Sequence, residues 1–168
     1  MGVAVLALLF LSGSSFTGPA GRTRPAGQAR SRVMLGEPVA YGGIQHAGIL
    51  VKDTAAAVRF YTEVLGMTDD THFRPETLPF NGAFVRAGAH QIHIMELPNP
   101  DPVDGRPEHG GRDRHIAITV DSIAPLKANL DSEGIPHTMS KSGRAALFCR
   151  DLDGNALEFM EATAVRDS

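Results

Sequence analysis

The sequence predicts an α+β domain over residues 44–162, built from two similar β-α-β-β-β halves. The first observation behind this prediction is an internal repeat, because residues 44–67 resemble residues 114–135. Each segment has a histidine near its start, then a short apolar run, then a polar residue at which a helix can begin. The second observation is that strand-like segments separated by turn residues follow each helix. A pattern that occurs twice indicates two copies of one supersecondary unit.

Each half contains one predicted helix with a single apolar face. The first helix begins after Asp53 and the second after Asp121 or Ser122, because short polar side chains cap the free N–H groups of a first turn. Gly66 and Gly134 end the two helices. Apolar residues recur at helical spacing, so one stripe on each helix faces a sheet. They are Ala57, Val58, Tyr61, Val64 and Leu65 in the first helix and Ile123, Leu126 and Leu130 in the second.

The other segments of each half alternate as strands do. An Asp-Gly pair at residues 153–154 is a strong hairpin signal between the last two strands. Residues 98–113 join the halves, and a connector this long is often a lid or a binding loop. The predicted strands are Ala47–Val51, Met67–Phe73, Gly82–Ala87 and Gln91–Leu97, then Ile116–Val120, Ile135–Ser140, Ala145–Arg150 and Ala156–Met160.

The N-terminal region has the composition of a targeting sequence. Residues 1–15 contain an unbroken apolar run, Val3–Leu11, followed by small residues, which is typical of a secretory signal peptide. Residues 16–43 begin with Phe16 and carry four arginines before the first acidic residue, Glu37, as transit peptides do. Together the two segments predict a two-part plastid address; a secretory protein and a disordered tail are the alternatives. Residues 163–168 form a short C-terminal tail.

The charge balance excludes one class of partner. Beyond residue 33 the chain has 12 basic and 19 acidic side chains, a net charge of −7. An acidic domain is a poor electrostatic match for nucleic acid. We expect a small-molecule partner, with no nucleic acid and, in the mature form, no membrane. The single cysteine, Cys149, allows no intrachain disulfide and lies in an apolar strand, so we expect it to be buried and inert.

Four residues at equivalent positions of the repeat predict a metal site. His46 and His115 open the first strands of the two halves, and His93 and Glu158 lie in the last strands. Two halves related by a pseudo-two-fold axis would bring these positions together. Imidazole and carboxylate groups suit Zn, Ni, Fe or Mn, and a metal removes the cost of burying a carboxylate. For any one of these histidines a hydrogen-bonded structural role is the alternative.

Strand parity decides between two candidates in the last strand of the first half. Glu96 lies three residues after His93, so the two side chains point to opposite faces. If His93 points inward, Glu96 points outward. The other histidines fall in turns or loops, where we expect them to be solvated; they are His72, His90, His109 and His137.

These features resemble the vicinal oxygen chelate superfamily, which includes glyoxalase I, extradiol dioxygenases and bleomycin resistance proteins. The resemblance covers residues 44–162 and implies two βαβββ modules whose mixed sheets curl around one divalent metal. It also implies a homodimer in many members, sometimes with the metal site shared across the interface. The segments that carry the resemblance are QHAGILVKD, AVRFYTEVLGM, IHIMELPNP, RHIAITVD and FCRDLDGNALEFME.

The resemblance implies a metal-dependent lyase or isomerase of glyoxalase I type. In such members the metal holds two neighbouring oxygens of a hemithioacetal formed from an α-ketoaldehyde and glutathione, and a carboxylate moves a proton between adjacent carbons. Glu158 matches that carboxylate, as metal ligand and catalytic base. The chain departs from glyoxalase I at His93, where a Glu is usual, and this puts the lactoylglutathione lyase reaction itself in doubt.

Three other functions stay open at this stage. Two histidines and one carboxylate are also the ligands of an Fe(II) extradiol-type dioxygenase. A metal-free small-molecule binding or resistance protein is another alternative, although the chain has no Trp and only two Tyr for an aromatic groove. A thiol transferase is the third, in which Arg106, Arg112 and Arg114 hold an anion; a solvated loop is the competing interpretation of these arginines.

Overall fold

Two four-stranded sheets, each with one helix, form the part of the chain that the structure describes. This computed structural model describes residues 39–162. The segments expected to act in targeting, residues 1–15 and residues 16–38 of the second segment, lie outside the described residues, as does the tail 163–168. The targeting prediction therefore stays a prediction. The described helices include none that is long and apolar enough to cross a membrane.

The first module confirms the predicted element order and corrects one strand. Its sheet has the order β1-β4-β3-β2, with β1 parallel to β4 and the other pairs antiparallel. The strand predicted over Met67–Phe73 is shortened to two residues and followed by a 3-10 turn, η2. The elements are β1 (His46–Val51), α1 (Thr54–Arg59), the π-helical turn η1 (Phe60–Val64), β2 (Thr68–Asp69), η2 (Thr71–Phe73), β3 (Gly82–Ala87) and β4 (His90–Glu96).

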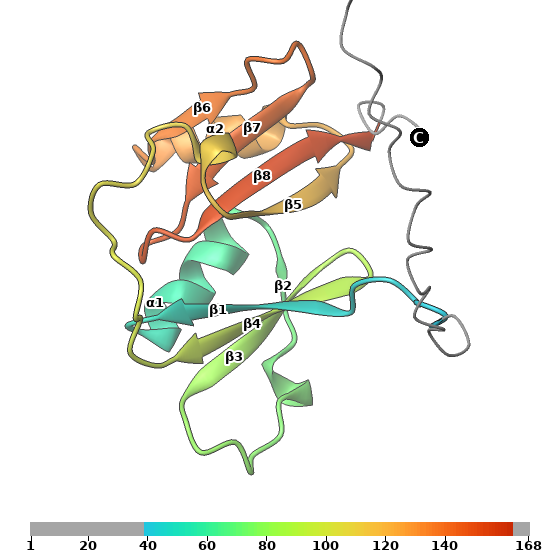
Figure 1. Ribbon diagram of the computed structural model, residues 1–168, viewed down its shortest axis with the longest axis vertical. Coiled ribbons are helices and arrows are strands. Elements are labelled where there is room, and N and C mark those ends of the chain that lie inside the picture. The colour runs from blue at the N-terminus through green and yellow to red at the C-terminus, as the bar shows by residue number, and fades with distance from the viewer. Residues whose placement is uncertain (1–38, 163–168) are drawn as a thin grey trace, which may run out of the picture. The chain divides into compact units, whose positions relative to one another are not determined.

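The second module has the same topology. Its sheet order is β5-β8-β7-β6, again with the first strand parallel to the last (Figure 1). A parallel pair needs a crossover connection, which the helix of each module supplies. The repeat in the sequence is thus a repeat in the structure. The elements are a 3-10 turn η3 (Gly110–Arg112) in the connector, β5 (His115–Val120), α2 (Ala124–Ser132), β6 (His137–Met139), β7 (Ala146–Arg150) and β8 (Ala156–Glu161).

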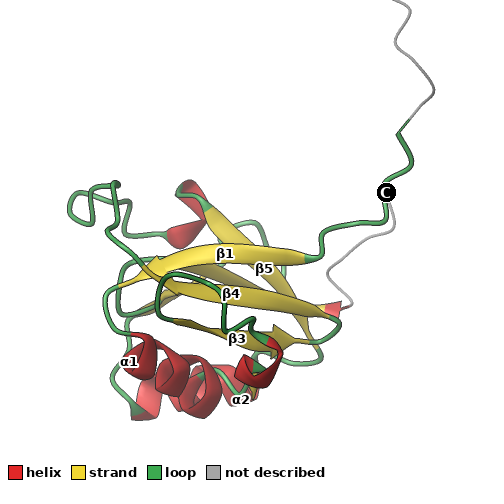
Figure 2. Cartoon of the chain, turned by 90° about the horizontal axis from the view of Figure 1, so that it is seen from below, coloured by secondary structure: helices red, strands yellow, loops and turns green. Residues whose placement is uncertain are grey.

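The core lies between the helices and the sheet faces that they cover (Figure 2). Tyr61 and Leu130 from the helical segments are fully buried against strand residues such as Val85, Ile94 and Leu157. Burying an aliphatic side chain of this size stabilises the fold by roughly 1.5–3 kcal/mol. Cys149 is part of this core, as expected, and burial raises the pKa of its thiol to about 12, which keeps it unreactive.

A carboxylate in the turn between β7 and β8 joins the two modules. Asp151 is only 8% exposed and accepts a hydrogen bond of 3.0 Å from the Tyr61 hydroxyl in η1. It also accepts from the backbone N–H groups of Asp153 and Asn155 and from the Asn155 amide. The Asn155 amide also donates a hydrogen bond of 3.0 Å to the backbone oxygen of Leu50. Burial raises the pKa of Asp151 although these hydrogen bonds oppose the shift.

Each helix start is tied to the last strand of its own module. Glu96 accepts hydrogen bonds from the backbone N–H and the hydroxyl of Thr54. Glu161, its repeat equivalent, accepts from the backbone N–H of Ile123 at 3.1 Å. The predicted cap at Asp53 is confirmed by its bond from Ala56 N–H. In the second module the helix begins at Ala124, whose N–H donates to the hydroxyl of Ser122 at 3.2 Å, and Glu161 of the last strand also holds this first turn.

Candidate metal centre

The four predicted ligands lie on the sheet faces that the helices do not cover. Side chains alternate along a strand, and Ile94 and Leu157 are buried on the helix side. Their neighbours His93 and Glu158 therefore lie on the opposite face. Glu96 lies three residues after His93, so its side chain points to the helix side, where it caps α1. The structure thus places His93, and not Glu96, on the face that the helices leave uncovered, as the strand parity predicted for an inward-pointing His93.

The first module brings its two histidines into contact. The rings of His46 and His93 stack with centroids 3.8 Å apart. Phe84, the partner of His93 in β3, stacks on the other side at 3.7 Å. Burial lowers the pKa of His93, and the neighbouring His46 lowers it further, which favours the neutral imidazole. A neutral imidazole has a nitrogen lone pair that can bind a metal ion.

The second module pairs His115 with Glu158. The distance from His115 Nε2 to Glu158 Oε2 is 2.9 Å. The other ring nitrogen, Nδ1, lies 2.8 Å from the backbone oxygen of Asp113. A carbonyl oxygen can only accept, so Nδ1 carries a proton. The second nitrogen, Nε2, faces the carboxylate, and either a proton or a metal cation held between the two groups makes this contact favourable.

The environment of Glu158 fits a divalent cation. The carboxylate is 4% exposed, and its Oε1 atom has no hydrogen-bond partner among the described residues. The cationic side chain beside it is Arg144, whose Nη2 lies 3.6 Å from Oε1. A buried carboxylate oxygen without a donor is costly. A histidine whose second nitrogen donates to a backbone carbonyl is also the usual arrangement around protein metal ions. His115 and Glu158 therefore suit a metal ion. We call this pair, and the pair of His46 and His93, the two half-sites.

The two half-sites do not meet within the chain. Across residues 39–162, no group of three or more His, Cys, Asp and Glu side chains converges as metal ligands do. His46 contacts His93, and His115 contacts Glu158, but the two pairs do not converge into one ligand group among these residues. That these four residues bind one metal ion therefore stays a prediction. A single chain holds them as two separate pairs.

Of the remaining histidines, His72 and His90 are exposed as expected, whereas His109 and His137 are half-buried. His137 is the first residue of β6 and lies near Asp131, with Nε2 3.6 Å from a carboxylate oxygen. His90 is the first residue of β4. In the connector, His109 accepts a hydrogen bond from Gly111 N–H and packs against Phe148. His109 and His137 thus contact the backbone of neighbouring turns and strands. Nothing in the sequence around these two residues indicated such contacts.

Sequence patterns also missed the aromatic neighbours of the half-sites. Phe84 and Phe148 are equivalent in the repeat, since each pairs in register with a predicted ligand of the last strand. The ring of Phe148 meets that of His115 edge to face, at 5.8 Å between centroids. The repeat would have revealed both residues if the third strands of the two halves had been aligned. They line the open sheet faces with apolar surface beside the ligands.

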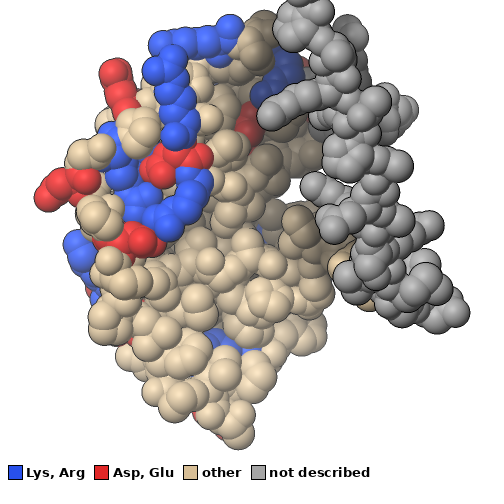
Figure 3. All heavy atoms as spheres, viewed as in Figure 1, with Lys and Arg blue, Asp and Glu red and all other residues tan. Residues whose placement is uncertain are grey.

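The connector is fastened to the second module by arginine–aspartate pairs. Arg150 of β7 donates to Asp113 and to the backbone oxygens of Pro107 and Gly154. Arg106 donates to the same carboxylate at 3.1 Å. Figure 3 shows basic and acidic side chains interleaved in this part of the surface. The segment that the sequence suggested as a lid is therefore held in place by several charged contacts.

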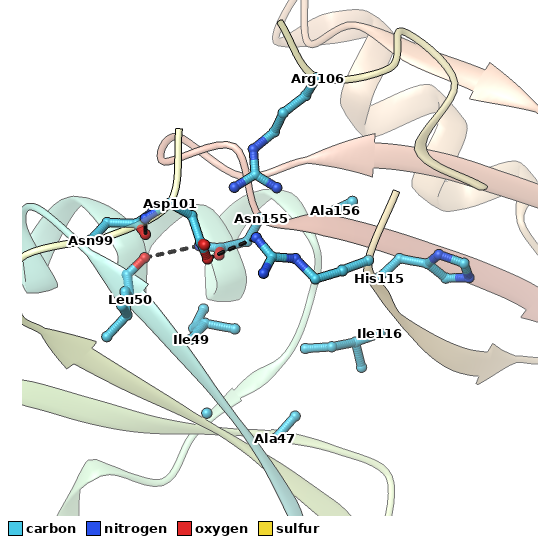
Figure 4. Close-up of a pocket in the computed structure, with 12 residues that line it drawn as sticks. Ala47, Ile49, Leu50, Asn99, Asp101, Arg106, His115, Ile116, Asn155 and Ala156 are labelled. Atoms are coloured by element: carbon cyan, nitrogen blue, oxygen red, sulfur yellow. Dashed lines mark hydrogen bonds and ion pairs between the residues drawn. The ribbon is translucent and has the colours of Figure 1, made fainter. Parts of the chain in front are cut away.

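A cavity of about 320 Å³ lies between the connector and the edge strands β1 and β5 (Figure 4). It is lined by Asn99, Asp101, Arg106 and His115 among others. Arg114, also in the lining, pairs with Asp101 at 2.7 Å. Since Arg106 and Arg114 both bind aspartates of the chain, their charges are balanced internally. This arrangement does not favour the anion site that a thiol transferase would need there.

Asp113 is expected to make the stability of the protein depend on pH in the acid range. Burial alone would raise its pKa, but hydrogen bonds from Arg150, Arg106 and the Arg114 backbone lower the pKa from 3.8 to about 2. A lowered folded-state pKa stabilises the protein above pH 4, and this contribution disappears as pH falls towards 2. Urea unfolding should show Asp113→Asn less stable by about 2 kcal/mol at pH 7 and by under about 0.5 kcal/mol at pH 2. An equal difference at both pH values would contradict this origin.

Comparison with known families identifies the superfamily. The family described as the Glyoxalase/Bleomycin resistance protein/Dioxygenase superfamily matches residues 43–159. The chain belongs to this superfamily. Among curated relatives of this superfamily member, Glyoxylase I 4 of Arabidopsis thaliana is 26% identical over 73% of the chain and 72% of the relative. The uncharacterized protein YaeR of Escherichia coli is 29% identical over 70% of the chain and 95% of the relative.

Solved structures show the same vicinal oxygen chelate fold. A glyoxalase family protein from Bacillus anthracis has 26% identity and a TM-score of 0.61, and the match covers 74% of this chain and 98% of that one. Lactoylglutathione lyase from Agrobacterium tumefaciens has 21% identity, a TM-score of 0.52 and coverage of 76% and 98%. FosX of Listeria monocytogenes, solved with Mn(II) and a dihydroxypropylphosphonic acid, has 16% identity, a TM-score of 0.56 and coverage of 73% and 93%. At the identities of the last two, the likeness concerns the fold.

Proposed function

We propose that the protein is a metal-dependent lyase or isomerase of glyoxalase I type. The ligands of its divalent ion, Zn, Ni or Mn, are His46, His93, His115 and Glu158. The observation that carries the proposal is the contact between His115 and Glu158. There, Nε2 of His115 lies 2.9 Å from a carboxylate oxygen, and a buried oxygen of Glu158 has no hydrogen-bond donor among the described residues. Such a pair is stable when a cation joins it.

We further propose that the metal centre forms between two copies of the chain. Each open sheet face carries half of the ligands, and the halves do not meet in one chain. In a two-fold dimer the first module of one copy faces the second module of the other, which gives two equivalent centres. The membership of the superfamily supports this arrangement, because many of its members are dimers.

The residues at the site would share the work in a defined way. A bound divalent ion supplies Lewis acidity that stabilises negative charge on two neighbouring oxygens of a substrate. Glu158, buried and without a donor at Oε1, is the group that can take a proton from the carbon beside those oxygens. Phe84 and Phe148 shield the site from water. The hemithioacetal of an α-ketoaldehyde and glutathione is the proposed substrate, by analogy with the relatives named for this activity.

The dioxygenase alternative uses the same residues with a different ion. His46, His115 and Glu158 would supply two imidazoles and a carboxylate to Fe(II). The identity of the metal separates the two functions: Ni, Zn or Mn supports the isomerase, and Fe supports the dioxygenase. A protein that binds its small molecule without any metal would agree with neither.

The test is the metal content of the purified full-length chain and of two glutamate variants. We expect about one divalent ion per chain in the wild type and its loss in Glu158→Gln, because the removed charge faces the ion. Glu161→Gln is the matched control, since Glu161 lies on the same strand but caps α2 on the covered face. It should keep the ion while losing about 1 kcal/mol of stability. Turnover of the hemithioacetal is then measured on the loaded wild type. A wild type that binds no ion after reconstitution would refute the metal-dependent function.

A further inference from the structure

A buried carboxylate outside the proposed ligand set is connected by hydrogen bonds to one of the ligands. Asp70, at the end of β2, is 1% exposed although it is charged. Its backbone N–H donates to the Phe84 backbone oxygen at 2.8 Å, which holds it beside β3. Its carboxylate accepts from the Arg86 guanidinium through one oxygen and from the Gln91 amide through the other, at 2.8 Å. None of the proposed catalytic steps uses this residue.

The hydrogen bonds run in one direction from Asp70 to His93. A carboxylate can only accept, so the NH2 group of Gln91 must face Asp70. The carbonyl oxygen of Gln91 then faces His93, at 3.2 Å from Nε2. Because a carbonyl also only accepts, His93 must donate from Nε2. In the neutral ring this leaves the lone pair on Nδ1.

We propose that Asp70 is a positioning residue that, through Gln91, fixes His93 as the tautomer with its proton on Nε2 and its lone pair on Nδ1. The significance of this tautomer rests on the proposed function, in which His93 is a metal ligand. Outer groups that orient a ligand histidine commonly change metal affinity by 10- to 100-fold. Asp70 does not touch His93, so any effect that it has on the ring passes through the amide of Gln91.

Substitution of Asp70 by asparagine should reverse the chain of hydrogen bonds. Arg86 keeps the remaining oxygen at position 70, so the new amide presents its NH2 group to Gln91. The Gln91 amide must then turn its carbonyl oxygen towards position 70 and its own NH2 group towards His93. This arrangement favours a lone pair on Nε2 and moves the proton to Nδ1. Arg86→Gln is the matched control, because it breaks the other contact of Asp70 and leaves the bond to Gln91.

The experiment is nitrogen NMR of the metal-free full-length chain labelled with 15N-histidine. We expect a protected Nε2–H signal for His93 in the wild type and in Arg86→Gln. In Asp70→Asn that signal should be replaced by an Nδ1–H signal, and in Gln91→Met the protection of the ring proton should be lost. An Nδ1–H tautomer in the wild type, or the same change in Arg86→Gln as in Asp70→Asn, would overturn the proposal.

A second measurement links the tautomer to metal binding. Zn²⁺ titration should show affinity lower by about 10- to 100-fold in Asp70→Asn and unchanged in Arg86→Gln. In the wild type Zn²⁺ should shift Nδ1 of His93 and keep its Nε2–H signal; loss of that signal would overturn the assignment. If the wild type binds no Zn²⁺, the proposed function fails, and the NMR of the metal-free chains still decides the tautomer.

Discussion

Two variants that cannot bind metal by themselves are expected to recover about one quarter of the metal sites when they are mixed. One variant is His46→Ala with His93→Ala, and the other is His115→Ala with Glu158→Gln. If each centre combines the first module of one copy with the second module of another, a mixed dimer has one intact centre and one that lacks all four ligands. Random exchange places half of the chains in mixed dimers, which gives about one quarter of the wild-type metal content.

The measurement is metal bound per chain after the two variants are unfolded together, refolded and dialysed against the ion. Each variant refolded separately is the control and should bind none. Circular dichroism of both variants checks that the losses come from the ligands and not from the fold. Zero recovery in the mixture, with about one ion per chain in the wild type, would show that the centre forms within a single chain.

The second large effect is expected at the contact between the modules. Asp151→Ala should lower the free energy of unfolding by about 3 kcal/mol, because a buried acceptor of four hydrogen bonds disappears. The Tyr61 hydroxyl and the Asn155 amide lose a buried partner. Tyr61→Phe should cost less, about 1–2 kcal/mol, since it removes one of the four donors and keeps the ring packed.

Urea unfolding at neutral pH measures both values. Asp121→Ala is a suitable control, because Asp121 is an exposed aspartate at the end of β5, and it should change stability by less than about 0.5 kcal/mol. If Asp151→Ala were no more destabilising than this control, the carboxylate would not be holding the modules together. A loss in Tyr61→Phe as large as that in Asp151→Ala would assign the stabilisation to the hydroxyl.

Much of the fold could be predicted because the sequence repeats itself. The spacing of His46 and His115 from the following helices, and the parity of His93 against Glu96, depend only on local periodicity. The predicted bounds of the second strand, Met67–Phe73, were wrong, and the reason is also local. Asp69 accepts a hydrogen bond from Thr71 N–H at 2.8 Å, and this turn competes with continued strand pairing.

Other features depend on contacts that no local pattern contains. Asp70 and Gln91 are far apart in sequence and meet only because β2, β3 and β4 lie side by side. The separation of the two half-sites is of the same kind. A repeat states that His46 and His115 are equivalent, but it does not state whether the equivalent faces meet within one chain or across two. Arg106 and Arg114 were interpreted as anion ligands or as solvated side chains, because their aspartate partners, Asp113 and Asp101, could not be assigned without the folded path.

The last strand of each module carries two residues with different roles, one on each face of the sheet. Glu96 and Glu161 hold the helix starts on the covered face, whereas the residue three positions earlier lies on the open face and takes no part in that closure. We therefore expect a change from imidazole to carboxylate at position 93 to leave the closure of the helix by Glu96 intact. In the proposed metal centre, that change would alter the ligand set while the scaffold of the module stays the same.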